Sequence, residues 1–186
     1  MTAFEQALKA ELEPWLLERG WKRQGKVTFL RFDRWHLCGI RIQQRQGNYA
    51  SGASLFTANI VKVARLFRKQ EVLEDYARSK WMWTEGGFYP LGAKVLVRIG
   101  ELTQVGSDLW YAYDALDAAD CRAVIGELCG DIEDHVLPCC DSALRLLWSR
   151  LKPGKSPARG DAHRRKADVL HRRILESANA TQDRSG

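Results

Sequence analysis

The chain has 186 residues, of which 45% are hydrophobic and 28% are charged, and its formal net charge is +6. This composition excludes a wholly disordered or collagen-like chain, and the length predicts one domain with an appendage. No apolar run approaches the roughly 18–20 residues that a membrane span requires, and the amphipathic N-terminus does not resemble a signal peptide.

The N-terminal residues predict a helix. Thr2 and Glu5 have the spacing of a capping box, and the apolar residues that follow recur at helical intervals. Pro14 predicts a kink or a restarted helix, because proline removes one backbone donor. Gly20 predicts the helix end, where a positive φ is often required.

Strands are predicted next. Residues 21–26 are expected to form a basic turn, and residues 27–32, 37–43 and 55–63 are rich in β-branched and aromatic side chains. The third of these runs has one apolar side and one mixed side. This alternation predicts a sheet with one covered face.

The second half of the chain predicts more mixed structure. Residues 64–80 follow a helical pattern, residues 81–92 form an aromatic, glycine-rich loop, and residues 94–99 and 109–113 are strand-like. After Asp114 the helical period returns, and Pro138 is expected to divide this part into two helices.

The predicted fold class is therefore α+β, with an N-terminal helix, an antiparallel sheet of about five strands and C-terminal helices packed on one face. Residues 1–151 are expected to form the single domain. Residues 152–160 are a Pro/Gly linker by composition, and residues 161–186 are predicted to be a short basic helix followed by a frayed tail.

Charge is distributed unevenly along the chain. Residues 1–100 hold 17 basic and 9 acidic side chains, residues 101–150 hold 3 and 10, and residues 151–186 hold 9 and 4. The body is thus nearly neutral, and the tail supplies most of the net charge. Segments of opposite sign either attract one another on folding or present a charged face to a partner.

The sequence offers little support for catalysis or metal binding. Five cysteines without a secretory signal indicate a reducing compartment, and we expect a cytoplasmic protein with packed thiols, no metal site and no cofactor. No nucleophile elbow is present, and the sequence 154–156 (Gly-Lys-Ser) lacks the rest of a phosphate-binding loop.

Aromatic residues are more informative. Trp81, Trp83 and Tyr89 lie in the glycine-rich loop, and Trp110 and Tyr111 lie in one strand. Exposed tryptophan and tyrosine beside arginine are typical of binding hot spots. The alternative is a second small apolar cluster folded under the loop.

Two sets of charged residues are further candidates for a functional site. Arg98, Glu101 and Asp108 could act in acid–base chemistry, or form a structural ion pair at a strand end. The basic side chains of the tail could neutralise nucleic-acid phosphates without sequence specificity. These tail residues are Arg164, Arg165, Lys166, Arg172 and Arg173.

Five short segments resemble the bacterial family catalogued as domain of unknown function 4304. They are residues 12–25, 42–45, 56–60, 98–102 and 108–111, of which the first has a Gly-aromatic-basic-basic-x-Gly turn after a helix. The family tends to have paired tryptophans where this chain has Trp-Tyr. The resemblance implies a bacterial, cytoplasmic, single-domain α+β protein without an assigned activity, and it singles out Asn59, Arg98 and Asp108 as polar positions.

Three functional hypotheses follow. The first is a non-catalytic protein-interaction domain, regulatory or of the immunity type, with an unidentified protein partner and no membrane association. The second is nucleic-acid binding through the basic tail. The third is a hydrolase or nuclease that uses Arg98, Glu101 and Asp108.

Overall fold

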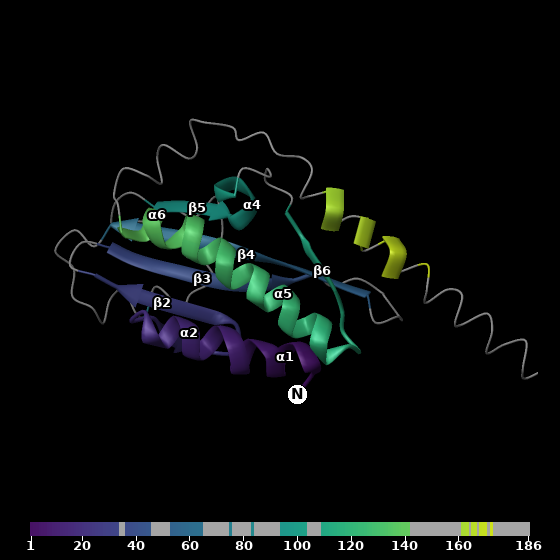
Figure 1. Cartoon of the computed structure of the whole chain (residues 1–186). Helices are drawn as coiled ribbons and strands as arrows, with labels where there is room; N and C mark the ends of the chain where they lie inside the picture. Colours follow the sequence, from purple (N-terminus) through teal and green to yellow (C-terminus); the bar gives the residue numbers. More distant parts are fainter. Residues whose placement is uncertain are drawn as a thin grey trace, which may run out of the picture.

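The structure, a computed structural model, describes residues 1–33, 36–45, 53–64, 75, 83, 94–103, 109–141, 161–163, 165, 166, 168–170 and 172. Within these residues the protein is α+β, with helices packed against an antiparallel sheet (Figure 1), which confirms the predicted fold class. Apart from Ala64, Asp75 and Trp83, the predicted helix over 64–80 and the aromatic loop over 81–92 lie outside the described residues. The same is true of the linker 152–160 and of residues 177–186.

The N-terminal helical stretch comprises α1 (Ala3–Ala7), the π-helical turn η1 (Leu8–Leu12) and α2 (Glu13–Glu18). The predicted capping box is present, since the Thr2 N–H donates to Glu5 Oε2 at 3.0 Å and the Glu5 N–H to Thr2 Oγ1 at 3.1 Å. Gly20 ends the stretch with a φ of 77°, as predicted.

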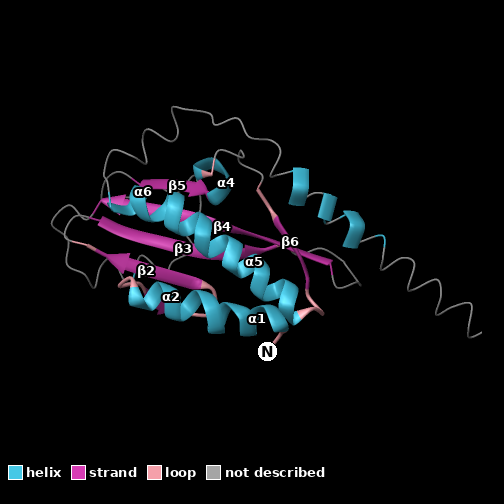
Figure 2. Cartoon of the chain, in the orientation of Figure 1, coloured by secondary structure: helices cyan, strands magenta, loops and turns pink. Residues whose placement is uncertain are grey.

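Within the described residues the sheet is a six-stranded antiparallel meander with one branch, whose arrangement can be followed in Figure 2. Its strands are β1 (Lys22–Gln24), β2 (Thr28–Phe32), β3 (His36–Gln44), β4 (Ala53–Ala64), β5 (Lys94–Arg98) and β6 (Tyr111–Asp114). The long strand β4 pairs with β3 along one edge, while β5 and β6 share its other edge. Strand β1 replaces part of the predicted basic turn, because three polar residues in a row show no alternation of apolar and polar side chains from which a strand could be predicted.

A short helix, α4 (Ile99–Leu102), follows β5, and the last long helical stretch comprises α5 (Ala118–Asp131), η3 (Ile132–Val136) and α6 (Leu137–Asp141). The predicted break at Pro138 is wrong, because the helix continues through it. A π-helical turn precedes both Pro14 and Pro138. A π-helical turn contains one residue more than an α-helical turn. This residue moves the carbonyl four positions before the proline, with which the proline ring would clash in a regular α-helix.

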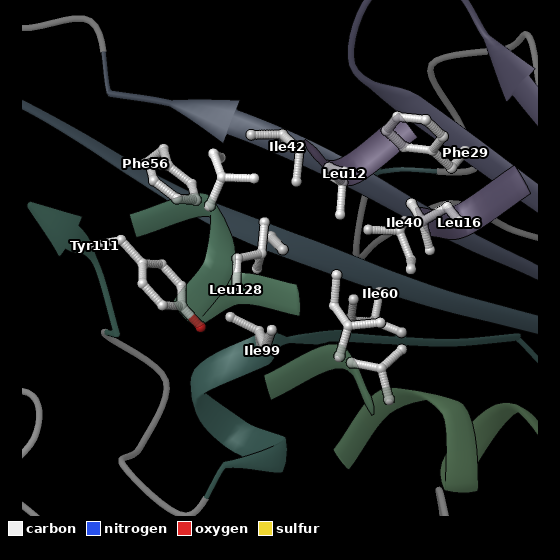
Figure 3. Packing of buried hydrophobic residues seen from close by; sticks show 14 of the residues in the cluster. Leu12, Leu16, Phe29, Ile40, Ile42, Phe56, Ile60, Ile99, Tyr111 and Leu128 are labelled. Carbon is white, nitrogen blue, oxygen red and sulfur yellow. The ribbon is translucent and has the colours of Figure 1, made fainter. Parts of the chain in front are cut away.

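The helices cover one face of the sheet and form the main core with it. Leu12 and Leu16 from the first helical stretch and Leu128 from α5 meet Ile40 and Ile60 from the sheet (Figure 3), and all five are buried. We call this side of the sheet the helix face. Since paired residues on antiparallel strands share a face, the strand register decides which side chains reach it.

The opposite face holds a smaller apolar cluster, so the expectation of a sheet covered on one face only is wrong. Leu30, Leu37, Val61 and Val63 are buried there. Trp83 packs against this cluster together with Phe32 and Leu96. Among the described residues, no helix has the length and apolar character needed to cross a bilayer.

Lys62 connects the helix face to the end of α6. Its side chain is 5% exposed, and its Nζ donates to the backbone oxygens of Cys139 at 3.0 Å and Cys140 at 2.8 Å. Hydrogen bonds from a charged donor are stronger than those from a neutral one, and losing such a donor leaves buried carbonyls without compensation for their lost hydration.

We expect Lys62→Met to lower the free energy of unfolding by about 2–3 kcal/mol, because two buried carbonyls lose a charged donor. Urea denaturation measures this change. The control is Lys22→Met on the exposed strand β1, which should change stability by no more than about 0.5 kcal/mol. Equal effects of the two substitutions would show that the buried ammonium group does not hold α6 on the sheet.

Candidate functional site

Three polar side chains form a row across the opposite face of the sheet. Asn59 of β4 pairs in register with Arg41 of β3 on one side and with Arg98 of β5 on the other. Adjacent strands lie about 4.8 Å apart, so the two arginines are separated by roughly two strand spacings with the amide between them. We call these three residues the arginine row.

A tryptophan lies against each arginine of the row. The guanidinium carbon of Arg41 is 5.7 Å from the ring centroid of Trp83, and that of Arg98 is 5.7 Å from the ring of Trp110. Both distances are within the range of a cation–π contact. These contacts orient the two guanidinium groups against aromatic rings on the same face of the sheet.

A cleft of about 240 Å³ adjoins the row. The residues that line it are Gln43, Asn59, Trp83, Leu96, Val97 and Arg98. Within the cleft the Asn59 Nδ2 donates to Gln43 Oε1 at 2.8 Å. Thr57, which pairs in register with Gln43, is fully buried, and within the described part of the chain its Oγ1 has no hydrogen-bond partner.

The strand cations of the helix face each have a specific partner inside the protein. Arg23 contacts the Glu13 carboxylate, Arg31 contacts the Asp141 carboxylate, and Lys62 donates to the carbonyls at the end of α6. On the opposite face Arg41 is exposed, and no carboxylate among the described residues pairs with it.

The charge pattern extends to whole layers of the molecule. The six strands contain seven Lys and Arg residues but one acidic residue, Asp114. The helical stretches from Ala3 to Glu18 and from Ala118 to Asp141 contain ten Asp and Glu residues but two Lys and Arg residues. The alternation of charge along the sequence thus becomes a separation between a basic sheet and an acidic helical layer.

The structure brings four of the predicted binding residues together, namely Asn59, Arg98, Trp83 and Trp110. Tyr111 does not belong with them, and this prediction is corrected. It points to the helix face, is fully buried, and its hydroxyl donates to the Asp131 carboxylate.

The remaining predicted binding residues, Trp81, Tyr89 and Asp108, lie outside the described residues. Sequence reasoning missed Arg41 and Gln43 as site residues. The alternation of side chains along β3 places Arg41 and Gln43 on the same face of the sheet. Only the register between β3 and β4 shows that this face also carries Asn59 beside them.

Of the three groups predicted for catalysis, Glu101 has a structural role, Arg98 belongs to the arginine row, and Asp108 lies outside the described residues. Glu101 Oε1 accepts the backbone N–H of Arg98 at 2.9 Å, which caps α4. In the described ranges no three His, Cys, Asp or Glu side chains lie close enough together to hold a metal ion.

Two of the described thiols are poor nucleophiles. Burial raises the pKa of Cys129 to about 11, and the pKa of Cys140 is raised by its hydrogen bond with Cys38 and by burial. Protonated, buried thiols react slowly, since the thiolate is the attacking form.

The basic tail residues lie on another side of the fold. Lys166 and Arg165 lie beside the start of α5, and Arg172 is exposed. Arg164 and Arg173 are outside the described residues. The tail and the arginine row are therefore two separate basic features.

Comparison with known proteins gives no relative: the chain matches no family model, no curated protein and no solved structure.

Alkaline pH should destabilise the protein partly through Cys129. The folded state keeps the Cys129 proton up to about pH 11, whereas an unfolded thiol loses it near pH 8.5. The stabilisation is therefore complete below pH 8.5 and is lost as the pH rises toward 11. Urea denaturation at pH 8 and pH 10 measures the loss.

Cys129→Ala should lose less stability than the wild type between these two pH values. Cys121, whose pKa burial also raises, titrates in both proteins and cancels in the comparison. Equal losses would contradict the assignment of the raised pKa to Cys129.

Proposed function

We propose that this protein is a non-catalytic, bacterial and cytoplasmic protein-interaction domain, regulatory or of the immunity type, that binds an acidic segment of a partner protein on the opposite face of its sheet. The observation that carries the proposal is the arginine row between two tryptophans, Trp83 and Trp110. Arginine and tryptophan are the residue types most enriched in binding hot spots.

Electrostatics supports an acidic partner. The strands carry seven basic residues and one acidic residue, and the acidic helical layer covers the other face of the sheet. A partner with a negative segment is thus attracted to one side of the molecule and repelled from the other. Such complementarity raises association rates and fixes the orientation of binding.

The chemistry of the cleft supports recognition rather than catalysis. Its lining combines a guanidinium group and two side-chain amides with an aromatic wall, and these residue types suit carboxylate and backbone groups of a peptide. The hydrolase alternative has weaker support, because Glu101 already caps α4. The resemblance to domain of unknown function 4304 remains a prediction that agrees with this proposal.

We expect Arg41→Glu to abolish capture of the partner from lysate of the native host, because it places a carboxylate where an acidic segment would bind. The matched control is Lys22→Glu, which reverses an exposed charge at the far edge of the same face. Quantitative mass spectrometry of proteins retained by the wild type and by both variants provides the measurement.

The proposal is supported if at least one protein is retained by both the wild type and Lys22→Glu but is not retained by Arg41→Glu. Titration calorimetry with the purified partner should then show at least a tenfold weaker affinity for Arg41→Glu, as expected for a central charged contact. If all three baits retain the same proteins, the arginine row is not a binding surface.

A further inference from the structure

The described part of the basic tail contacts the body of the protein through two ion pairs and one ring contact. Lys166 Nζ lies 2.7 Å from Asp120 Oδ1 at the start of α5. The two side chains are 38% and 22% exposed, so water only partly screens this ion pair. We call the described residues between 161 and 172 the tail helix.

Two further side chains hold the tail helix in place. The imidazole of His163 is buried, meets the ring of Tyr111 edge-on at a centroid distance of 5.2 Å, and places Nε2 3.8 Å from Glu127 Oε1. Leu170 is 8% exposed. The contact thus combines apolar burial with charge pairing.

The acidic surface beneath the tail helix is built independently of it. Asp117 caps α5 by accepting the N–H groups of Ala119 and Asp120, and Asp120 Oδ2 accepts the Asp114 N–H at 2.8 Å. These bonds lie within the body, so the carboxylates remain in position when the tail helix leaves.

The fit between the tail helix and this surface is incomplete. A cleft of about 400 Å³ separates them, and its lining residues are Asp114, Asp117, Asp120, Arg165, Lys166, Val169 and Leu170. Val169 is 48% exposed. Because part of the interface is unfilled, fewer packing contacts oppose undocking than in a close-packed core.

We propose that the tail helix binds nucleic-acid phosphates and that the acidic start of α5 is its intramolecular competitor. Asp120 occupies Lys166 in the docked state, so a phosphate must displace a carboxylate before it reaches this lysine. Arg165 shares the same acidic surroundings, whereas Arg172 is exposed. The inference concerns a surface separate from the arginine row and does not depend on the proposed protein partner.

The competition follows from electrostatics. A phosphate backbone and the aspartates attract the same cations, and both attractions weaken with salt. Removing the aspartate charge therefore strengthens nucleic-acid binding, whereas a purely structural ion pair would affect only the stability of the fold.

The test uses the full-length protein and a fluorescein-labelled 20-base-pair DNA, with binding followed by fluorescence anisotropy between 50 and 200 mM salt. Asp120→Asn keeps an oxygen that accepts the Asp114 N–H and removes the charge that holds Lys166. We expect it to bind about fivefold more tightly than the wild type, corresponding to loss of one partly exposed ion pair. The slope of log affinity against log salt should steepen by about 0.9 for one added phosphate contact.

The control is Asp134→Asn, which removes one negative charge from an exposed position on η3. It should change the affinity less than twofold and leave the salt slope unchanged. A second variant, Asp120→Asn combined with Lys166→Gln, should lose the gain in affinity, because the released cation is then absent.

Three results would overturn the proposal. The first is that neither the wild type nor Asp120→Asn binds DNA measurably. The second is that Asp120→Asn and Asp134→Asn bind DNA with equal affinity. The third is that the gain in DNA affinity persists when Asp120→Asn is combined with Lys166→Gln. Thermal denaturation of each variant verifies that the comparison is made between folded proteins.

Discussion

The register of β4 determines both the core and the candidate site. This twelve-residue strand is paired along its whole length, with β3 on one side and with β5 and β6 on the other. Side chains alternate between the two faces, so Ile60 and Lys62 point to the helices while Asn59 joins the arginine row. A shift of one residue would move Asn59 into the apolar core and remove the cleft, which is why the site depends on exact pairing of this strand.

Charge separation connects the fold to both proposed interactions. On the helix face each strand cation has a carboxylate or carbonyl partner, and on the opposite face each arginine of the row contacts a tryptophan. The tail helix finds its complement on α5. The acidic helical layer thus neutralises one group of cations and leaves the sheet basic on its opposite face, which gives the molecule two electrostatically distinct sides.

Local patterns were sufficient for the fold class, but not for the site. The stop at Gly20 could be predicted because a helix end with positive φ depends on neighbouring residues. Pro138 was misread because its effect depends on the π-helical turn before it. The grouping of Arg41, Asn59 and Arg98 depends on register between strands far apart in sequence, and no local pattern encodes that register. The sequence shows the residue types of these three side chains, but it does not show that they lie close together.

Site-specific photo-crosslinking tests the central claim most directly. p-Benzoylphenylalanine in place of Arg45, an exposed residue that follows β3 beyond Gln43, should capture a discrete protein adduct in the native host. The same group in place of Arg122, exposed on α5 in the acidic layer, should capture none. An adduct at position 122 alone, the same adduct at both positions, or no adduct at position 45 would contradict a binding surface on the opposite face of the sheet.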